Sequence, residues 1–180
     1  TSSFGCAAGG EQKPGVFGAG TGSALWNFPI TNINFAGITT DLVTMKARAI
    51  SNGVYVGPAA PLGQGYRIVL KSDRTFDLYR VNTISWVWGL HGNDMLWHQD
   101  YHIISSQTLL GNTPLPANCG LLFIEDDVWI EGVVKGKVTV ASADTINVGA
   151  VTDMVLNNNI TYTVTDGTDG LTAVAENSVL

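Results

Sequence analysis

The chain has 180 residues, of which 45% are hydrophobic and only 13% are charged, so it is long enough for one domain with a buried core and too apolar to be disordered. Its net charge of −6 and its nine scattered Lys and Arg residues argue against a nucleic-acid partner, which needs clustered cations. No stretch reaches the about 18 to 20 apolar residues of a membrane span, and no signal peptide is present. Both ends of the chain look cut, since it starts at Thr1 and stops within an apolar run.

The first 29 residues are rich in Gly, Ala and Ser, which predicts an extended N-terminal segment. A helix is expected over residues 40–52, capped by Thr39 or Thr40 and ended by Asn52 and Gly53. Its apolar residues follow helical spacing on one face. A single helix with one apolar stripe needs a partner, and we expect it to pack on a hairpin over residues 66–82.

That hairpin is predicted by the segments "GYRIVLKS" and "TFDLYRV", which alternate in polarity and are joined by "SDR". Residues 85–102 are aromatic and irregular in pattern, with a turn signal at Gly92 and Asn93. The segment "NTPLPANCG" then excludes a central strand, because proline cannot donate to a sheet. Residues 30–119 are therefore expected to form a small α+β subdomain.

From Gly120 onward the chain consists of short β-type runs separated by Asp, Asn and Gly. The runs are "LLFIE", "VWIEG", "GKVTVAS", "TINVG", "NNITYTV" and "LTAVAENSVL". Such a pattern is typical of a sandwich or of a solenoid in which short parallel strands stack. The run Asn157–Asn159 favours the solenoid, because Asn tolerates the backbone of a coil corner. The predicted fold class is thus mainly β, with residues 120–180 forming a solenoid-like subdomain that is truncated at its C-terminal end.

The order of these segments resembles the β-rich downstream domain of PilX-like type IV pilus-assembly proteins, which are similar to minor pilins. The segments that carry the resemblance are "INFAGITTDLVTMKARAISNGVYV", "GYRIVLKSDRTFDLYRV", "PANCGLLFIEDDVWIEGVVKGKVTVASA" and "NNNITYTVTDGTDGLTAVAENSVL". The resemblance covers roughly residues 30–180. The resemblance implies a bacterial cell-surface protein with a hydrophobic pilin-type helix before Thr1, a tail beyond Leu180, and other pilin-like subunits as partners.

All three histidines lie within twelve residues, together with two carboxylates. The set is His91, Asp94, His98, Asp100 and His102. These side chains could hold zinc or another divalent ion, although their spacing matches no recognised site. The alternative is a polar, aromatic surface loop whose histidines make ordinary hydrogen bonds.

Two other acidic segments are weaker candidates. Glu125–Asp127 could supply a catalytic carboxylate, but neighbouring residues on a strand point to opposite faces, so a solvated turn is the preferred interpretation. Residues 165–170, "TDGTDG", lack the full spacing of a calcium loop and are expected to form a plain turn. No nucleophile elbow or phosphate-binding loop is present.

The two cysteines, Cys6 and Cys119, are expected to form a disulfide if the chain lies outside the cytoplasm, and to be buried thiols otherwise. Among the aromatic residues, Trp97 and Tyr101 are the candidates for surface contact. Most of the five tryptophans are expected in the core.

We therefore expect a non-enzymatic structural or adhesion module without a cofactor, a minor component of a type IV pilus. Its expected partners are pilin-like subunits, other cell-surface components or surface glycans, and it would meet a membrane only through the missing N-terminal helix. The alternatives are a secreted solenoid that binds or cleaves carbohydrate, and a cell-surface domain unrelated to pili.

Overall fold

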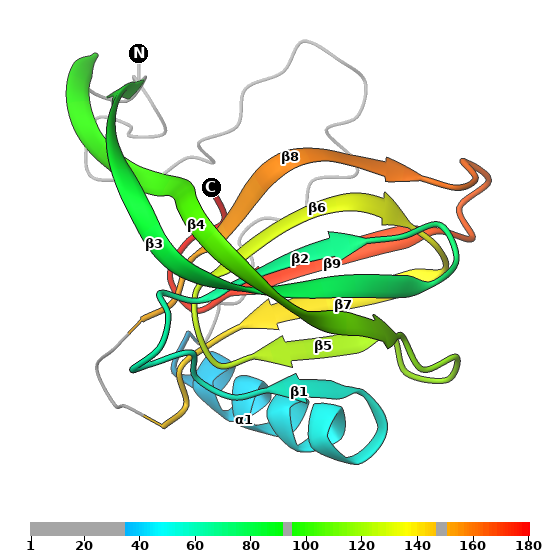
Figure 1. Cartoon of the computed structure of the whole chain (residues 1–180). Helices are drawn as coiled ribbons and strands as arrows, with labels where there is room; N and C mark the ends of the chain where they lie inside the picture. The colour runs from blue at the N-terminus through cyan, green and yellow to red at the C-terminus, as the bar shows by residue number, and fades with distance from the viewer. Residues whose placement is uncertain (1–34, 92–94, 147–150) are drawn as a thin grey trace, which may run out of the picture. The chain divides into compact units, whose positions relative to one another are not determined.

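The protein is described by a computed structural model that covers residues 35–91, 95–146 and 151–180. The chain divides into two units, Thr1–Gly37 and Ile38–Leu180, and the account below concerns the second. This unit is mainly β, as predicted, with one helix and two sheets in the described part (Figure 1). Its elements are α1 (Phe35–Asn52), β1 (Val54–Val56), β2 (Tyr66–Leu70), β3 (Thr75–His91), β4 (Leu96–Pro114), β5 (Leu121–Ile124), β6 (Val128–Val134), β7 (Lys137–Ser142), β8 (Met154–Tyr162) and β9 (Gly170–Ala175).

The two sheets are built from strands that alternate along the chain. The four-stranded sheet has the order β1-β5-β7-β9 and is entirely parallel. The five-stranded sheet has the order β4-β3-β2-β6-β8, in which β2, β6 and β8 are parallel and the hairpin β3–β4 is antiparallel. Along the chain, each of the strand pairs β1–β2, β5–β6 and β7–β8 therefore adds one strand to each sheet. In both sheets a strand that precedes Gly120 is hydrogen-bonded to a strand that follows it. After β9 the chain returns to the five-stranded sheet, where Val179 forms a parallel bridge with Met154.

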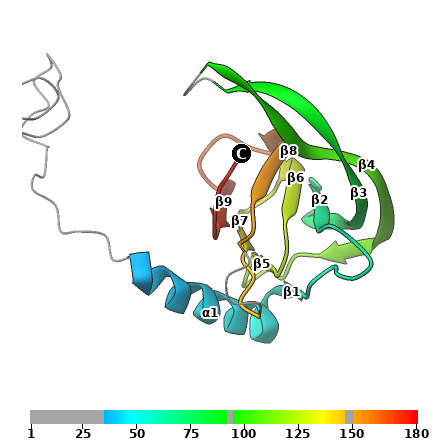
Figure 2. The ribbon, with the colours of Figure 1, turned by 90° about the vertical axis from the view of Figure 1, so that its left-hand side faces the viewer.

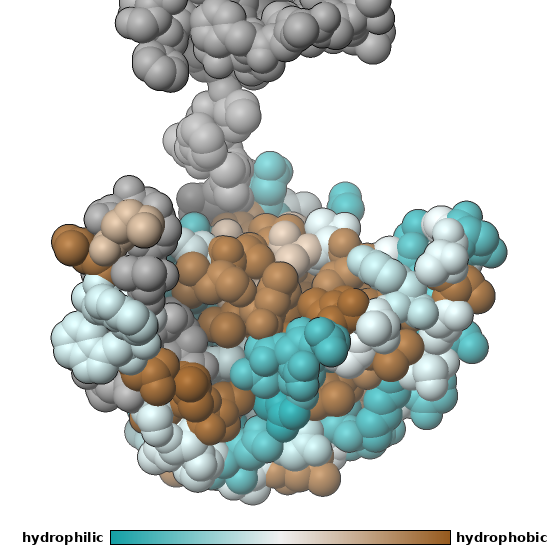
Figure 3. Space-filling model, turned by 90° about the horizontal axis from the view of Figure 1, so that it is seen from above, coloured by the Kyte–Doolittle hydropathy of each residue, from teal (hydrophilic) through white to brown (hydrophobic). Residues whose placement is uncertain are grey.

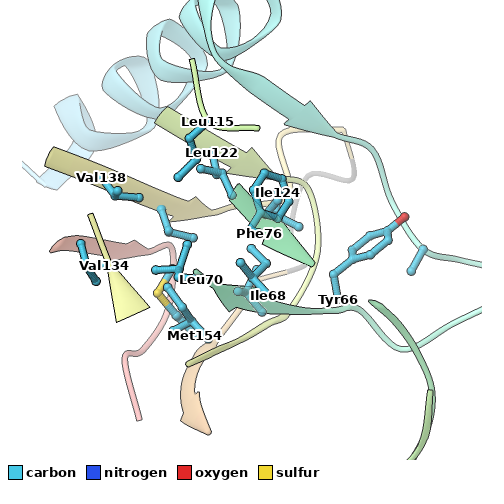
Figure 4. Close-up of a cluster of buried hydrophobic side chains, with 14 residues drawn as sticks. Tyr66, Ile68, Leu70, Phe76, Leu115, Leu122, Ile124, Val134, Val138 and Met154 are labelled. Atoms are coloured by element: carbon cyan, nitrogen blue, oxygen red, sulfur yellow. The ribbon is translucent and has the colours of Figure 1, made fainter. Parts of the chain in front are cut away.

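The two sheets face each other as layers and enclose the main core (Figure 2). Alternate residues of each strand point inward, so that Ile68 and Leu70 of β2 meet Leu122 and Ile124 of β5 (Figure 4). These four side chains are at most 2% exposed. Most of the short strands after Gly120 were recognised correctly from the sequence because this alternation is a local property. The run "TINVG" is an exception, since its described residues, Thr145 and Ile146, form a bend and not a strand.

Strand β5 is buried along its whole length because both of its faces are covered. Leu122 and Ile124 point into the main core, while Leu121 and Phe123 form a second cluster with Leu42 and the rest of the helix's apolar stripe. The uninterrupted apolar run "LLFI" is typical of a strand buried on both sides. The expected packing of the helix on the 66–82 hairpin is wrong: α1 covers the outer face of the four-stranded sheet.

Two local predictions about the helix and the middle of the chain also need correction. The helix begins at Phe35, so Thr39 and Thr40 lie inside it and do not cap it, although its end at Asn52 is as predicted. Residues 85–102 are not irregular, because β3 and β4 continue as one long hairpin. The predicted turn residues Gly92 and Asn93 lie outside the described residues. The hairpin of β2 and β3 is confirmed, with Leu70 opposite Phe76.

The asparagine run was expected at a corner and instead lies inside β8. The pairing of β6 with β8 shifts there: Ile130 pairs with Leu156, but Gly132 pairs with Ile160. Gly132 has a φ of +109°, and a Cβ at this position would lie 2.2 Å from the carbonyl oxygen of Leu70. Asn157–Asn159 thus form a bulge opposite Glu131, next to this glycine, a role that sequence composition does not distinguish from a corner.

Candidate functional site

The most exposed feature of the unit is the outer part of the β3–β4 hairpin, residues 85–103, which we call the arm. It extends beyond the other strands of its sheet (Figures 1 and 2). Trp88 pairs with Gln99, and Trp97 lies two residues before Gln99 on the same strand. Since side chains alternate along a strand, Trp88 and Trp97 lie on the same face of the arm. They are 67% and 63% exposed.

The arm is apolar and nearly without charge. Met95 and Leu96 at its tip are 69% and 60% exposed, and Ile103 at its base is 50% exposed. The sequence between Arg80 and Glu125 contains no Lys or Arg and only two carboxylates. On the face seen from above, hydrophobic side chains gather in the middle, with hydrophilic ones interrupting and bordering them (Figure 3). Exposed apolar surface of this kind is typical of an interaction site.

The candidate contact residue Trp97 is exposed, and its role in a contact stays a prediction. The side chain of Tyr101 lies outside the description. Trp88 was missed because exposure cannot be read from an aromatic residue by itself. The sequence context could have pointed to Trp88 as a contact residue, since it lies in a segment with almost no charge and no strict alternation of polar residues. Trp129, by contrast, is 1% exposed. Of the three tryptophans whose side chains are described it is the buried one, so the expectation that most tryptophans lie in the core is not met among them.

The predicted metal-binding cluster lies on the same arm. His98 pairs with Gly89, Asp100 pairs with Val87, and His91 pairs with Leu96, so these residues belong to facing strands near the tip. Asp94 lies outside the described residues, as do the side chains of His91, His98, Asp100 and His102. Among the described side chains, no group of three or more His, Cys, Asp or Glu is placed to hold a metal. The metal site on the arm stays a prediction.

At the base of the arm the five-stranded sheet curls so that its two edge strands approach. Ile103 and Gln107 of β4 and Asn157 of β8 line one pocket of about 230 Å³, together with Arg67. Arg67 forms an ion pair with the buried Glu131, whose other oxygen accepts a hydrogen bond of 2.9 Å from Asn157 Nδ2. The Nε of Arg67 is buried and has no hydrogen-bond partner. Arg67 and Glu131 therefore compensate each other's charge in this pocket, and Asn157 connects the edge strand β8 to the pair.

A second set of polar residues is buried between the helix and the four-stranded sheet. Glu125 is 1% exposed and forms an ion pair with Lys46, whose Nζ lies 2.6 Å from Oε1 of Glu125. It also accepts hydrogen bonds from the hydroxyls of Tyr55 and Thr145. Burial raises the pKa of the Glu125 carboxyl, but these three donors outweigh it and hold the pKa below its ordinary value. Burial and the hydrogen bond to Glu125 raise the pKa of Tyr55 to about 12.

Glu125 was expected in a solvated turn, and this expectation is wrong. Glu125 directly follows the apolar run of β5, which is buried on both faces. This position in the sequence could have indicated that Glu125 is buried. The residue connects the helix to the sheet. Both of its oxygens accept hydrogen bonds from neighbours in the fold, Oε1 from Lys46 and Thr145 and Oε2 from Tyr55.

The corner where the chain passes from the four-stranded to the five-stranded sheet is rich in aspartates. Each accepts a backbone N–H from a neighbouring corner: Asp126 Oδ2 from Ala59 at 2.8 Å and Asp127 Oδ1 from Asp153 at 2.8 Å. Asp153 Oδ1 in turn accepts from Ser178 at 3.0 Å. Hydrogen bonds from backbone N–H groups to carboxylates are strong, and here they connect successive corners along the stack of strands.

A pocket of about 190 Å³ opens at this corner. We call it the acidic pocket, and its polar lining comprises Glu125, Asp126, Asp127, Asp144 and Thr152. Burial raises the pKa of Asp126, and the nearby charge of Asp144 raises it further. Asp126 and Asp144 are 18 residues apart in sequence and meet only through the fold.

The remaining candidates have local roles. In the segment 165–170, Asp166 Oδ1 accepts a hydrogen bond from the N–H of Thr168, and Asp169 accepts hydrogen bonds from Gly136 and Val164, which together hold a plain turn. Cys119 is a free, half-buried thiol, and Cys6 lies outside the described residues, so their disulfide stays a prediction. In the described part of the chain, no helix is long and apolar enough to cross a membrane.

Comparison with known proteins gives no relative to guide the assignment. No family model, no curated protein and no solved structure matches this chain. The class that the fold itself defines is a mainly β unit with two facing sheets, one helix and a projecting apolar arm.

Proposed function

We propose that this protein is a non-enzymatic cell-surface module for adhesion or assembly, and that its contact element is the arm. The observation that carries this proposal is the pair Trp88 and Trp97, both more than 60% exposed on one face of a projecting hairpin. Large aromatic side chains are costly to expose to water, and they are the residues that dominate binding at protein interfaces.

The scaffold that presents the arm is inferred to be a short β-solenoid with two strands per turn. The alternation of β1-β2, β5-β6 and β7-β8 between two sheets supports this inference, as does the parallel pairing within each sheet. The aspartates that bond successive corners are a further support. In this interpretation the β3–β4 hairpin is an insertion between the first and second turns.

The setting in a type IV pilus rests on the sequence resemblance alone. A pilin-like partner suits an apolar surface with few charges, because subunit interfaces exclude charged residues from their centre. The second candidate function is carbohydrate binding. It is favoured by the two tryptophans on one face of the arm, since aromatic faces stack on neutral sugars.

The experiment measures binding of the purified domain to type IV pilus filaments and to an array of bacterial surface glycans by biolayer interferometry. A double variant, Trp88→Ser with Trp97→Ser, is compared with Leu62→Ser, which removes an equally exposed apolar residue (67%) outside the arm. We expect filament binding that is lost in the double variant and kept in Leu62→Ser.

Glycan binding lost in the double variant would select the carbohydrate function instead. Binding that is equal in all three proteins would contradict the role of the arm. Turnover of glycans, peptides or phosphoesters by the parent protein, abolished by a single substitution such as His98→Ala, would overturn the non-enzymatic assignment.

A further inference from the structure

The stack of strands is open at the end formed by β8 and β9, where rows of buried side chains end in solvent. Ile68, Ile130 and Leu156 occupy one inward row across β2, β6 and β8. Ile68 and Ile130 are fully buried, whereas Leu156 is 48% exposed. Figure 3 looks onto this end and shows hydrophobic side chains gathered in its middle. The last strands thus expose apolar side chains at positions that the earlier strands bury, which is typical of an interaction surface.

The backbone of β9 is free along this end. β9 is the last strand of the four-stranded sheet, and among the described residues it pairs with β7 alone. The N–H of Gly170 donates to the carbonyl of Gly136, immediately before β7, at 3.0 Å. Since N–H and C=O groups alternate in direction along a strand, those of Leu171, Ala173 and Ala175 point to the open edge. β9 can therefore accept a further strand without losing its bonds to β7.

β9 lacks the features that usually protect a free strand edge. Charged side chains, prolines and bulges keep such edges from pairing with other strands. The neighbouring strand β8 has a bulge at Asn157–Asn159, and Ser178–Leu180 bond to its first residues. β9 contains no charged residue and no proline, and its register with β7 is uninterrupted.

The chemistry of this end favours a second copy of the chain as the partner. Neither β8 nor β9 carries a charged side chain, although the chain has a net charge of −6. Two such ends therefore meet without like charges in the strands that face each other. A two-fold axis makes the two β9 strands antiparallel, and each contact then occurs twice. With the axis at Ala173, this residue lies opposite its own counterpart, and Leu171 lies opposite the partner's Ala175.

The step at this end is also self-complementary. β9 follows β8 in the chain and therefore lies half a turn further along the stack. Paired strands are about 4.8 Å apart, so direct pairing of the two β9 strands leaves room for one strand between β8 and its counterpart. Ser178–Leu180 enter that space from one end of β8, where they bond to Met154 and Leu156. The two-fold axis brings the same segment of the partner in from the other end.

We propose that this protein forms a two-fold dimer through the β8–β9 end, in which the two β9 strands pair antiparallel and the exposed rows of the core are covered. The four-stranded sheets of the two copies become one continuous sheet. The inference goes beyond the proposed function and does not rest on it, since the arm is not part of this contact. A dimer carries two arms, which strengthens attachment to a surface that offers many binding sites.

The test is sedimentation equilibrium of the parent protein at about 100 μM, above the micromolar dissociation constants typical of modest interfaces. We expect twice the 19.1 kDa mass of the chain. Ala173→Pro removes an N–H that points away from β7, so it breaks the central bonds between the copies and spares the sheet of each copy. It should raise the dissociation constant of the dimer about tenfold or more, because two hydrogen bonds are lost. Ala173→Ser keeps the N–H and is the matched control.

The place of the contact is checked by hydrogen exchange of the parent protein. On concentration, exchange should slow in residues 170–176 and stay unchanged in residues 105–113 of the other long edge, β4. Should Ala173→Pro fail to fold, this measurement decides by itself. Thr108→Lys adds a charge at an exposed position of β4 and should leave the dimer intact.

Three results would overturn the proposal. The first is a monomeric parent protein at about 100 μM. The second is a folded Ala173→Pro variant that dimerises as well as Ala173→Ser. The third is a dimer that is lost in Thr108→Lys or in the double variant Trp88→Ser with Trp97→Ser, because the contact would then lie on β4 or on the arm.

Discussion

The body of the unit and the arm both contain large apolar residues, but the body buries them and the arm exposes them. In the body, formed by α1, β1, β2 and β5–β9, the apolar side chains of β5 and β6 are almost fully buried. In the arm, Trp88, Met95, Leu96 and Trp97 are each at least 60% exposed. In the body the two sheets face each other, and α1 covers the outer face of the four-stranded sheet. The arm is a two-stranded ribbon that no sheet of the described residues faces (Figure 2). Stability therefore belongs to the body, and the surface available for binding belongs to the arm.

The largest expected effect compares one tryptophan from each region. Trp129→Ala removes a side chain that is 1% exposed in β6 and should lower the free energy of unfolding by about 3 to 5 kcal/mol. Trp97→Ala removes one that is 63% exposed and should change it by at most about 0.5 kcal/mol. Urea unfolding followed by circular dichroism measures both. Similar losses in the two variants would show that the arm is packed against something in solution.

The next effect concerns the ion pair that joins the helix to the body. Lys46→Met leaves Glu125 buried without its cation and should lower the free energy of unfolding by about 2 to 4 kcal/mol, because the hydrogen bonds from Tyr55 and Thr145 still solvate the carboxylate. Lys71→Met is the control. It breaks a 2.7 Å pair with Asp77 in which Lys71 is 41% exposed, and should cost much less than Lys46→Met because solvent screens an exposed pair. Equal costs for the two variants would contradict the special position of Glu125.

The same cluster predicts a smaller, pH-dependent effect. The folded-state pKa of Glu125 lies below its ordinary value of 4.5, so its stabilising contribution is present above about pH 4.5 and is lost as the pH falls through the lower folded-state pKa. Urea unfolding from pH 6 down to pH 3 should show this loss in the parent protein. In Glu125→Gln the free energy of unfolding should change less with pH over the same range. A slope equal to that of the parent would contradict the lowered pKa of Glu125 in the folded state.

The smallest expected change follows removal of the arm itself. Replacing residues 86–102 by an Asn-Gly turn joins Ser85 to Ile103, which already pair, and should change the free energy of unfolding by less than about 1 kcal/mol. Filament or glycan binding should disappear. A protein that no longer folds would show that the arm contributes to the body, and retained binding would move the contact surface elsewhere.

Much of the local structure of this protein was predictable from its sequence. Alternating buried residues predicted the β2–β3 hairpin and the short strands after Gly120, and Asn52 with Gly53 predicted the end of the helix. These features depend on neighbours within a few residues, where side-chain period and turn chemistry act directly. The arm was missed because its strands lack a buried face, and alternation is the signal on which strand prediction depends.

Only the tertiary structure decided which strands pair and which polar residues meet. Val54 lies beside Leu122 and Tyr66 beside Val128, and no local pattern specifies partners so far apart in the sequence. The same pairing buries Glu125 against Lys46 and brings Asp126 to Asp144. The period of a strand gives its faces but not its neighbour, because backbone hydrogen bonds are identical for every partner and the choice depends on how the whole core packs.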